Sequence, residues 1–243
     1  MGSRQREQIL LDIERSLGGM NGEWGQGQAD GTAAAPEWVP EDAPWDEVKK
    51  ELEALSDRFH VAEQARDLHR ILEEIIQEHH VSLAVRWNHP LLERLGIDRV
   101  LADRGVEVRV PSREEEWKAI AAKAQLGITA VDALVMESGT LILKASKEWG
   151  RAVSLVPPVH LAIVRPNQRL GKLQALPRLF RYWAKGPHGL PSAIALITGH
   201  SRTADIELIL VSGVHGPGMV HVIGLSPGYD SADGAVPGTE TRP

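Results

Sequence analysis

The residues of this 243-residue chain with the clearest chemical potential stand in three short polar segments, and one of them holds an arginine between two hydroxyls. In that segment Ser201, Arg202 and Thr203 are followed closely by Asp205 and Glu207. A guanidinium donates two parallel hydrogen bonds to a carboxylate or a phosphate, and neighbouring hydroxyls complete such a shell. We therefore expect these five residues to bind a small anion. An internal ion pair of Arg202 with one of the two acids is the structural alternative.

A second segment combines a carboxylate with two hydroxyls around a glycine. Glu137, Ser138, Gly139 and Thr140 follow one another in the sequence. The glycine permits close approach of the backbone to a ligand, and Glu137 is a candidate catalytic residue that would act as a base or a nucleophile at a bound carbonyl. We expect Ser138, Gly139 and Thr140 to contact the substrate. The alternative is a capped helix that runs into an ordinary turn.

The third segment places one imidazole between glycines, in the run Gly213, Val214, His215, Gly216 and Pro217. A histidine in this setting can exchange a proton near neutral pH, while the glycines let the backbone approach a ligand. His215 is therefore the second candidate catalytic residue. A tight turn with an incidental histidine is the alternative.

Several common signatures are missing from the sequence. It contains no G-x-x-x-x-G-K-[ST], no G-x-G-x-x-G, no H-E-x-x-H and no G-x-S-x-G. We predict no metal in this chain, because the histidines that stand near other polar residues match no metal motif: His79, His80, His200, His215 and His221. The disfavoured alternative is a metal held by His200, Asp205, Glu207 and His215.

Composition limits the remaining classes of function. Lys+Arg 27 against Asp+Glu 33 gives a formal net charge of -6, which disfavours a nucleic-acid partner. Cys 0 excludes a thiolate nucleophile and a cysteine-held iron–sulfur cluster, so any redox centre must belong to another chain. We see neither a signal-peptide core nor an uncharged apolar run near the roughly 18 residues of a spanning helix. We therefore expect a cytoplasmic protein without a membrane span.

Apolar runs and helical spacings alternate along the chain at lengths typical of an α/β protein. The apolar runs predict strands at 81–85, 106–110, 140–143, 159–164, 193–198 and 219–225. Helical spacing predicts helices over 59–76 and from Ser112 through Ala121, and the pair Thr129 and Asp132 predicts a further helix start. The fold class that follows is α/β, with an open, mainly parallel sheet flanked by helices. In such sheets ligands bind at the carboxyl ends of the strands.

The two ends of the chain differ in composition from its middle. We expect residues 1–47 to form a helix at Arg4–Leu17 and a Gly- and Pro-rich linker, residues 48–225 to form one α/β domain, and residues 226–243 to form a mobile tail. Trp24, Trp38 and Trp45 leave two interpretations of the linker open. They are exposed indoles in a solvated segment, or they pack on the globular body or on a second subunit.

Taken in order, the polar segments resemble the LUD domain of the lactate-utilisation protein C family. The motifs that carry this resemblance stand here at 129–133, 137–140, 157–160, 199–207 and 213–217, and the last two are the most specific. The resemblance spans about residues 50–225. This sequence departs from the family pattern with Ser138 in place of threonine and with His200 in place of proline.

The resemblance implies a fold similar to the NagB/RpiA/CoA-transferase group and a role in the oxidation of L-lactate to pyruvate beside iron–sulfur partner subunits. The chain would then carry no cofactor of its own and would bind a small carboxylate or phosphate. One alternative is an isomerase or CoA-transferase-like enzyme that uses Glu137. Another is a catalytically silent accessory subunit that docks through residues 1–47 onto the iron–sulfur subunits. A homo-oligomer is compatible with each of these.

Overall fold

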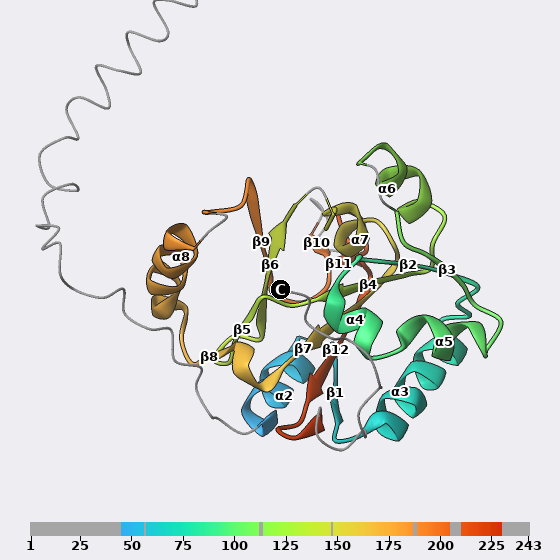
Figure 1. Cartoon of the computed structure of the whole chain (residues 1–243), viewed down its shortest axis with the longest axis horizontal. Coiled ribbons are helices and arrows are strands. Elements are labelled where there is room, and N and C mark those ends of the chain that lie inside the picture. Colours follow the sequence, from blue (N-terminus) through green and yellow to red (C-terminus); the bar gives the residue numbers. More distant parts are fainter. Residues whose placement is uncertain are drawn as a thin grey trace, which may run out of the picture. The chain divides into compact units, whose positions relative to one another are not determined.

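Helices and strands alternate along the chain, and the strands gather into sheets with helices packed against them (Figure 1). The structure is a computed structural model and describes residues 45–55, 57–111, 114–146, 148–186, 189–204 and 210–229. The predicted helix at Arg4–Leu17, the linker up to residue 44 and the tail from residue 230 lie outside these residues. No helix in the described part is long and apolar enough to cross a membrane.

The bounds of the elements are as follows. The helices are α2 (Trp45–Ala54), α3 (Ala65–Glu78), α4 (Pro90–Arg94), α5 (Ile97–Ala102), α6 (Glu114–Ala121), α7 (Ala152–Leu155) and α8 (Leu176–Lys185), with the short 3-10 helices η1 (Pro166–Gln168) and η2 (Leu173–Ala175). The strands are β1 (Arg58–Ala62), β2 (Leu83–Arg86), β3 (Glu107–Arg109), β4 (Leu126–Ala130), β5 (Ala133–Val135), β6 (Thr140–Ala145), β7 (Val159–Val164), β8 (Arg169–Leu170), β9 (Ala193–Ile197), β10 (Arg202–Ala204), β11 (Leu210–Ser212) and β12 (Met219–Leu225).

The main sheet has six strands in the order β1-β12-β7-β4-β2-β3, and every neighbouring pair is parallel. This confirms the predicted open, mainly parallel sheet of an α/β protein. Strands β4 and β7 are buried along their whole length, so both faces of the sheet must be covered. In Figure 1, α3 and α5 lie on one side of this sheet, and α2, α7 and a second sheet lie on the other.

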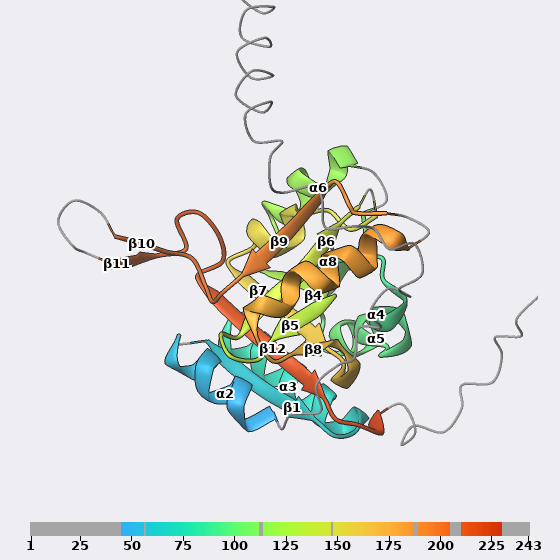
Figure 2. The ribbon, with the colours of Figure 1, turned by 90° about the vertical axis from the view of Figure 1, so that its left-hand side faces the viewer.

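The second sheet has four strands in the order β8-β5-β6-β9, and β6 pairs antiparallel with both β5 and β9. Successive side chains of a strand point to opposite faces of the sheet, so the two faces of this sheet pack into two different hydrophobic clusters. Leu134, Leu141 and Leu143 join the main core, whereas Ala133, Val135 and Ile142 pack with Leu179 of α8 in a small separate core. Figure 2 shows α8 lying across this sheet.

Trp45 belongs to the folded body. It opens α2, is buried, and packs on Phe59 of β1 with ring centroids 5.5 Å apart. The guanidinium carbon of Arg169 lies 4.8 Å from the centroid of the same indole. The interpretation that these tryptophans pack on the globular body therefore holds for Trp45, while Trp24 and Trp38 lie outside the described residues.

The predicted helix over 59–76 is wrong in its first part. Residues Arg58–Ala62 form the edge strand β1, which pairs with β12, and α3 begins only at Ala65. The Asp67 carboxylate accepts a hydrogen bond from the backbone N–H of Gln64 at 3.1 Å and so fixes this start. The five residues of β1 are too few to separate the period of a strand from that of a helix.

The predicted helix start at Thr129 and Asp132 is also wrong. Thr129 lies inside β4, and the Asp132 carboxylate accepts a hydrogen bond from the backbone N–H of Lys144 at 2.7 Å. The Lys144 ammonium lies 3.1 Å from the same carboxylate. Burial raises the pKa of Asp132, and the contacts with Lys144 oppose that shift. A capping rule that considers only neighbours in sequence cannot detect a partner across the sheet.

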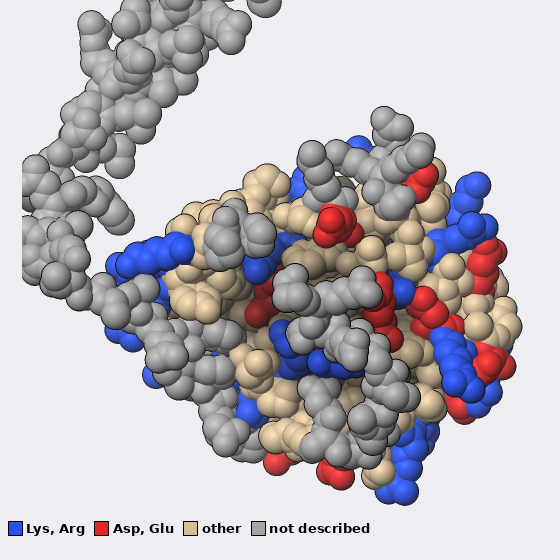
Figure 3. All heavy atoms as spheres, in the orientation of Figure 1, with Lys and Arg blue, Asp and Glu red and all other residues tan. Residues whose placement is uncertain are grey.

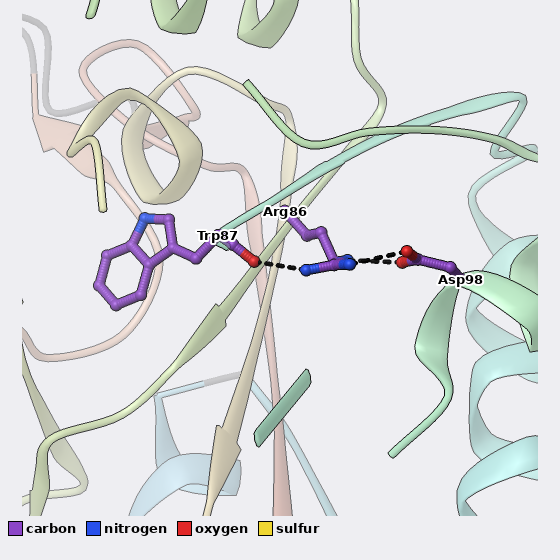
Figure 4. Close-up of polar contacts among 3 residues, drawn as sticks. All are labelled: Arg86, Trp87 and Asp98. Carbon is purple, nitrogen blue, oxygen red and sulfur yellow. Dashed lines mark hydrogen bonds and ion pairs between the residues drawn. The ribbon is translucent and has the colours of Figure 1, made fainter. Parts of the chain in front are cut away.

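A buried arginine joins the main sheet to α5 (Figure 4). Arg86, at the end of β2, donates from Nε and Nη2 to the two carboxylate oxygens of Asp98 at 2.5 and 2.7 Å, and from Nη1 to the Trp87 carbonyl at 2.8 Å. The Arg86 side chain is 5% exposed and the Asp98 side chain 48% exposed. The two ends of this ion pair therefore differ in their access to water.

We expect Asp98→Ala to lower the free energy of unfolding by about 2 kcal/mol, and Arg86→Met to lower it by less. The first change leaves a buried charge without its partner, whereas the second leaves a carboxylate that water can reach. Urea unfolding of both variants measures the difference, with Asp103→Ala, at an exposed position, as the control. A larger loss for Arg86→Met would contradict this account.

Candidate functional site

The turn that holds Glu137 to Thr140 joins β5 to β6. Gly139 has φ +63, and a Cβ there would lie 2.8 Å from Cδ2 of Leu52 in α2, so both the backbone and the packing require glycine. The Ser138 and Thr140 hydroxyls are 2.7 Å apart, and the Thr140 hydroxyl lies 2.7 Å from that of Thr198. A row of three hydroxyls therefore connects this turn to the residue that follows β9.

The Glu137 carboxylate already has a structural partner. Its Oε1 accepts a hydrogen bond from the backbone N–H of Leu173 at 2.7 Å, at the start of η2. The backbone N–H of Glu137 in turn donates to the Gly171 carbonyl at 3.1 Å. Glu137 is exposed, so this contact ties one polar turn to the next at the surface.

His200 is paired with a buried carboxylate that the sequence analysis did not identify. The Nδ1 of His200 lies 2.9 Å from Oδ1 of Asp57, whose side chain is fully buried. Gly199, with φ +79, fits against this carboxylate, since a Cβ there would lie 2.9 Å from Oδ2 of Asp57. Burial raises the pKa of Asp57, and the hydrogen bond and the charge of His200 oppose that shift. Asp57 thus holds the imidazole in one orientation, with Nε2 directed away from the carboxylate.

Ser201 connects two of the three predicted segments. Its backbone N–H donates to the Pro217 carbonyl at 2.9 Å, and its carbonyl accepts from the backbone N–H of Gly213 at 2.9 Å. Its hydroxyl accepts from the backbone N–H of His215 at 3.2 Å. Ser201 is therefore bonded at both its backbone and its side chain to the glycine-rich loop before β12.

We call residues 137–140, 198–201 and 213–218 the polar junction. One set of hydrogen bonds joins the hydroxyls of Ser138, Thr140 and Thr198, and a second set joins Ser201 to the loop that holds His215. The predicted segments of Arg202 and His215 therefore meet at Ser201, whereas the segment of Glu137 is bonded to Thr198, three residues before Ser201. Among the described contacts, no hydrogen bond joins the side chains of Glu137 and His215.

The binding residues after Ser201 are only partly described. Arg202 and Thr203 lie in β10, which pairs antiparallel with β11, and Arg202 is opposite Ser212. For these two residues the structure describes the backbone alone, and Asp205 and Glu207 lie outside the described residues. Figure 2 shows β10 and β11 projecting from the rest of the fold, so Arg202 stands where the hairpin leaves the junction.

The junction lies at the amino ends of the parallel strands, and the expectation of the carboxyl ends is wrong for this part. The Pro158 carbonyl, just before β7, accepts hydrogen bonds from Gly218 and Met219 at 2.9 and 3.3 Å, where β12 begins. Asp57 precedes β1 in the same way. The reason is that β9 belongs to the second sheet, so its carboxyl end reaches the opposite edge of the main sheet.

The described part of the chain has one hollow near the polar junction and another beside the second sheet. The first has a volume of about 460 Å³ and is lined by Lys49, Glu53, Asp57, Arg58, Phe59 and His60. The second, of about 590 Å³, lies between Lys144, Trp149 and Leu190. Glu137, Ser201 and His215 line neither of these two, while Asp57 connects the first to the His200 side of the junction.

Charges on the opposite side of the main sheet are of mixed sign. Figure 3 shows basic and acidic side chains interspersed over the side formed by α3 and α5. Arg70 pairs with Glu74 at 2.7 Å, and Arg104 pairs with Glu73. Exposed pairs of this kind contribute little to stability. They leave no continuous basic surface on this side.

These features define an α/β protein whose glycine-rich and hydroxyl-bearing loops meet at one edge of a parallel sheet. A model of the LUD domain matches residues 45–224, and the chain belongs to this family. The match includes the polar junction and all six strands of the main sheet except the last residue of β12.

Named relatives match most of the chain. The chain is 34% identical over 193 residues to "Lactate utilization protein C" of Geobacillus sp., covering 75% of this chain and 80% of the relative. It is 29% identical over 217 residues to "Lactate utilization protein C" of Halalkalibacterium halodurans, covering 88% and 94%. A crystal structure of a DUF162 family protein from Deinococcus radiodurans is 19% identical, covers 74% of this chain and 95% of its own, and has a TM-score of 0.49.

Proposed function

We propose that this chain is a component of lactate utilisation and that its polar junction binds a small carboxylate. The observation that carries the proposal is the bonding of Ser201 to the His215 loop, because it gathers hydroxyls, an imidazole and backbone N–H groups at one point. The names of the relatives support the metabolic role. The backbone N–H groups of Ser201, Gly213 and His215 already donate within the junction, so the donors for a carboxylate are the Ser201 hydroxyl and the side chains around it.

In this proposal Arg202 grips the carboxylate of lactate or pyruvate with its guanidinium fork, and Ser201 and Thr203 complete the shell. His215, whose backbone N–H donates to the Ser201 hydroxyl, acts at the end of the ligand that carries the hydroxyl. Glu137 acts indirectly, because its carboxylate ties the 137–140 turn to Leu173. His200, held by Asp57 at 2.9 Å, adds an imidazole of fixed orientation beside Ser201.

Oxidation of lactate to pyruvate releases two electrons and two protons, and this chain has no residue that can hold the electrons. With Cys 0, it cannot ligate an iron–sulfur cluster through thiolates. We therefore assign the electron carriers to iron–sulfur partner subunits. This chain would bind and orient the substrate or organise its partners.

We expect Arg202→Ala to weaken the binding of lactate or pyruvate roughly ten- to a hundredfold, because a charged hydrogen-bonded contact contributes about 1.5 to 3 kcal/mol. Isothermal titration calorimetry with lactate, pyruvate and phosphate on the full chain measures this. Arg178→Ala, at an exposed position of α8, is the matched control. Equal heats for wild type and Arg202→Ala would remove Arg202 from the role, and a preference for phosphate would identify the anion as phosphate instead.

A further inference from the structure

Three histidines that are far apart in sequence meet on the α3 side of the main sheet. His60 comes from β1, His221 from the start of β12, and His79 caps the C-terminus of α3. Nε2 of His79 lies 2.9 Å from Nε2 of His221, and Nε2 of His60 lies 3.1 Å from Nδ1 of His221. His221 is 1% exposed, whereas the other two rings are half-buried.

The turn after α3 sets the position of His79. The helix ends at Glu78, and His80 adopts φ 50, so that the backbone N–H of Val81 donates to the Ile76 carbonyl at 3.0 Å. This left-handed turn closes the helix directly after His79, its C-cap residue. The ring stands edge-on to His221, with an interplanar angle of 81° and centroids 5.1 Å apart.

We propose that His79, His221 and Glu78 bind a divalent transition-metal ion of the zinc type. Two imidazole nitrogens and a carboxylate oxygen lie within 4.8 Å of one another. Imidazole and carboxylate ligands suit Zn²⁺ and its first-row neighbours, and three protein ligands leave one position open to water. The Glu78 side chain is 47% exposed, which gives an ion a path from solvent.

His60 has a separate part in this arrangement. A neutral imidazole carries one N–H, so His221 can donate from Nδ1 to His60 while its Nε2 lone pair faces the ion. A metal-bound histidine usually donates its other N–H to a neighbour, and that neighbour fixes the orientation of the ring. His60 is therefore a positioning residue, 3.1 Å from the nitrogen that does not bind the metal.

The two Nε2 atoms lie 2.9 Å apart, at hydrogen-bond distance. Zinc–nitrogen bonds of about 2.0–2.1 Å in a tetrahedral site place the two nitrogens roughly 3.3 Å apart. Uptake of the ion therefore requires a shift of a few tenths of an ångström, which the half-buried His79 can make. The carboxyl end of the 14-residue helix α3 also favours a cation here.

Arg58 opposes the ion. Its Nη2 lies 3.8 Å from Oε1 of Glu78, and both side chains are about half exposed, at 59% and 47%. A metal ion must compete with this guanidinium for the carboxylate. Removal of the Arg58 charge should therefore tighten metal binding, which gives the site a signature that scattered surface histidines lack.

The test uses the full chain after removal of metal with a chelator, titrated with ZnCl₂ by calorimetry and with CoCl₂ by absorption. We expect one ion per chain, a loss of affinity of at least about tenfold in Glu78→Gln and in His79→Ala, a gain in Arg58→Gln, and no change in His69→Ala. His69 is exposed on the same helix and serves as the matched control. Glu78→Gln changes an exposed side chain without altering its size, so it keeps the test valid if His79→Ala fails to fold.

Failure to take up zinc would overturn the proposal. So would equal affinity in wild type and Glu78→Gln, or an equal loss in His69→Ala, because both would place the ion elsewhere. An unchanged affinity in Arg58→Gln would contradict the competition between Arg58 and the ion for Glu78. None of these measurements depends on lactate, so the metal site and the carboxylate site are tested independently of each other.

Discussion

Replacing Gly127 with alanine is expected to lower the free energy of unfolding by more than about 3 kcal/mol, or to prevent folding. Gly127 lies in β4, in the middle of the main sheet, and a Cβ there would lie 1.9 Å from the carbonyl oxygen of Val153 in α7. It would also lie 3.1 Å from Cγ of Pro157. The neighbours are backbone and a proline ring, so the clash cannot be relieved by rotation of a flexible side chain.

Urea unfolding followed by circular dichroism measures the effect, with Gly105→Ala as the control. Gly105 has φ +76 but no atom within 4 Å of an added Cβ, so alanine there costs only about 1 kcal/mol for its backbone conformation. Similar losses in the two variants would contradict the packing argument. An alanine at position 127 would displace α7. Because α7 leads directly into the turn at Pro158, the hydrogen bonds of the Pro158 carbonyl to the start of β12 would weaken as well.

Between pH 6.5 and pH 4 the protein is expected to lose about 3 kcal/mol of stability through His160 alone. His160 lies in β7 and is fully buried, and burial lowers its pKa from 6.5 to about 4. Below pH 6.5 the unfolded chain binds a proton at this residue, whereas the folded chain does so only near pH 4. Stability is therefore full above pH 6.5 and falls as the pH decreases towards 4.

The surroundings of the ring explain why the folded protein resists this proton. Nε2 of His160 is 2.8 Å from the Thr129 hydroxyl, while Nδ1 has no hydrogen-bond partner among the described residues. A protonated ring carries N–H on both nitrogens, so one would remain unpaired in the core. Urea unfolding at a series of pH values should show a smaller acid loss in His160→Gln than in wild type. An equal loss in both would assign the acid sensitivity to other groups.

The elements that the sequence predicted best are those that the sheet buries on both faces. The runs 159–164 and 219–225 match β7 and β12, and the helix predicted to end at Ala121 ends there. Uninterrupted apolar sequence of strand length is sufficient evidence for a central parallel strand. Strand β4 was missed because Gly127 and Thr129 interrupt its apolar character, and close packing of α7 is what demands the glycine.

The sequence identified three candidate segments for the site, but it could not predict how these segments lie relative to one another. Each segment carries a local signal, a glycine beside hydroxyls or an imidazole, whereas their meeting depends on β9 pairing antiparallel with β6. Asp57 is a single acid before a short strand, and only the folded chain places it beside His200. The same holds for His60, His79 and His221, which come together through strand register and a helix end.

The polar junction crosses between the two sheets of the fold. Ser138 lies in the turn between β5 and β6 of the four-stranded sheet, and Thr198 follows its strand β9, whereas His215 belongs to the loop that leads into the main sheet. A molecule bonded to both parts at once would act as a cross-link. Binding of such a molecule would stabilise the packing of the two sheets against each other, including parts that it does not contact.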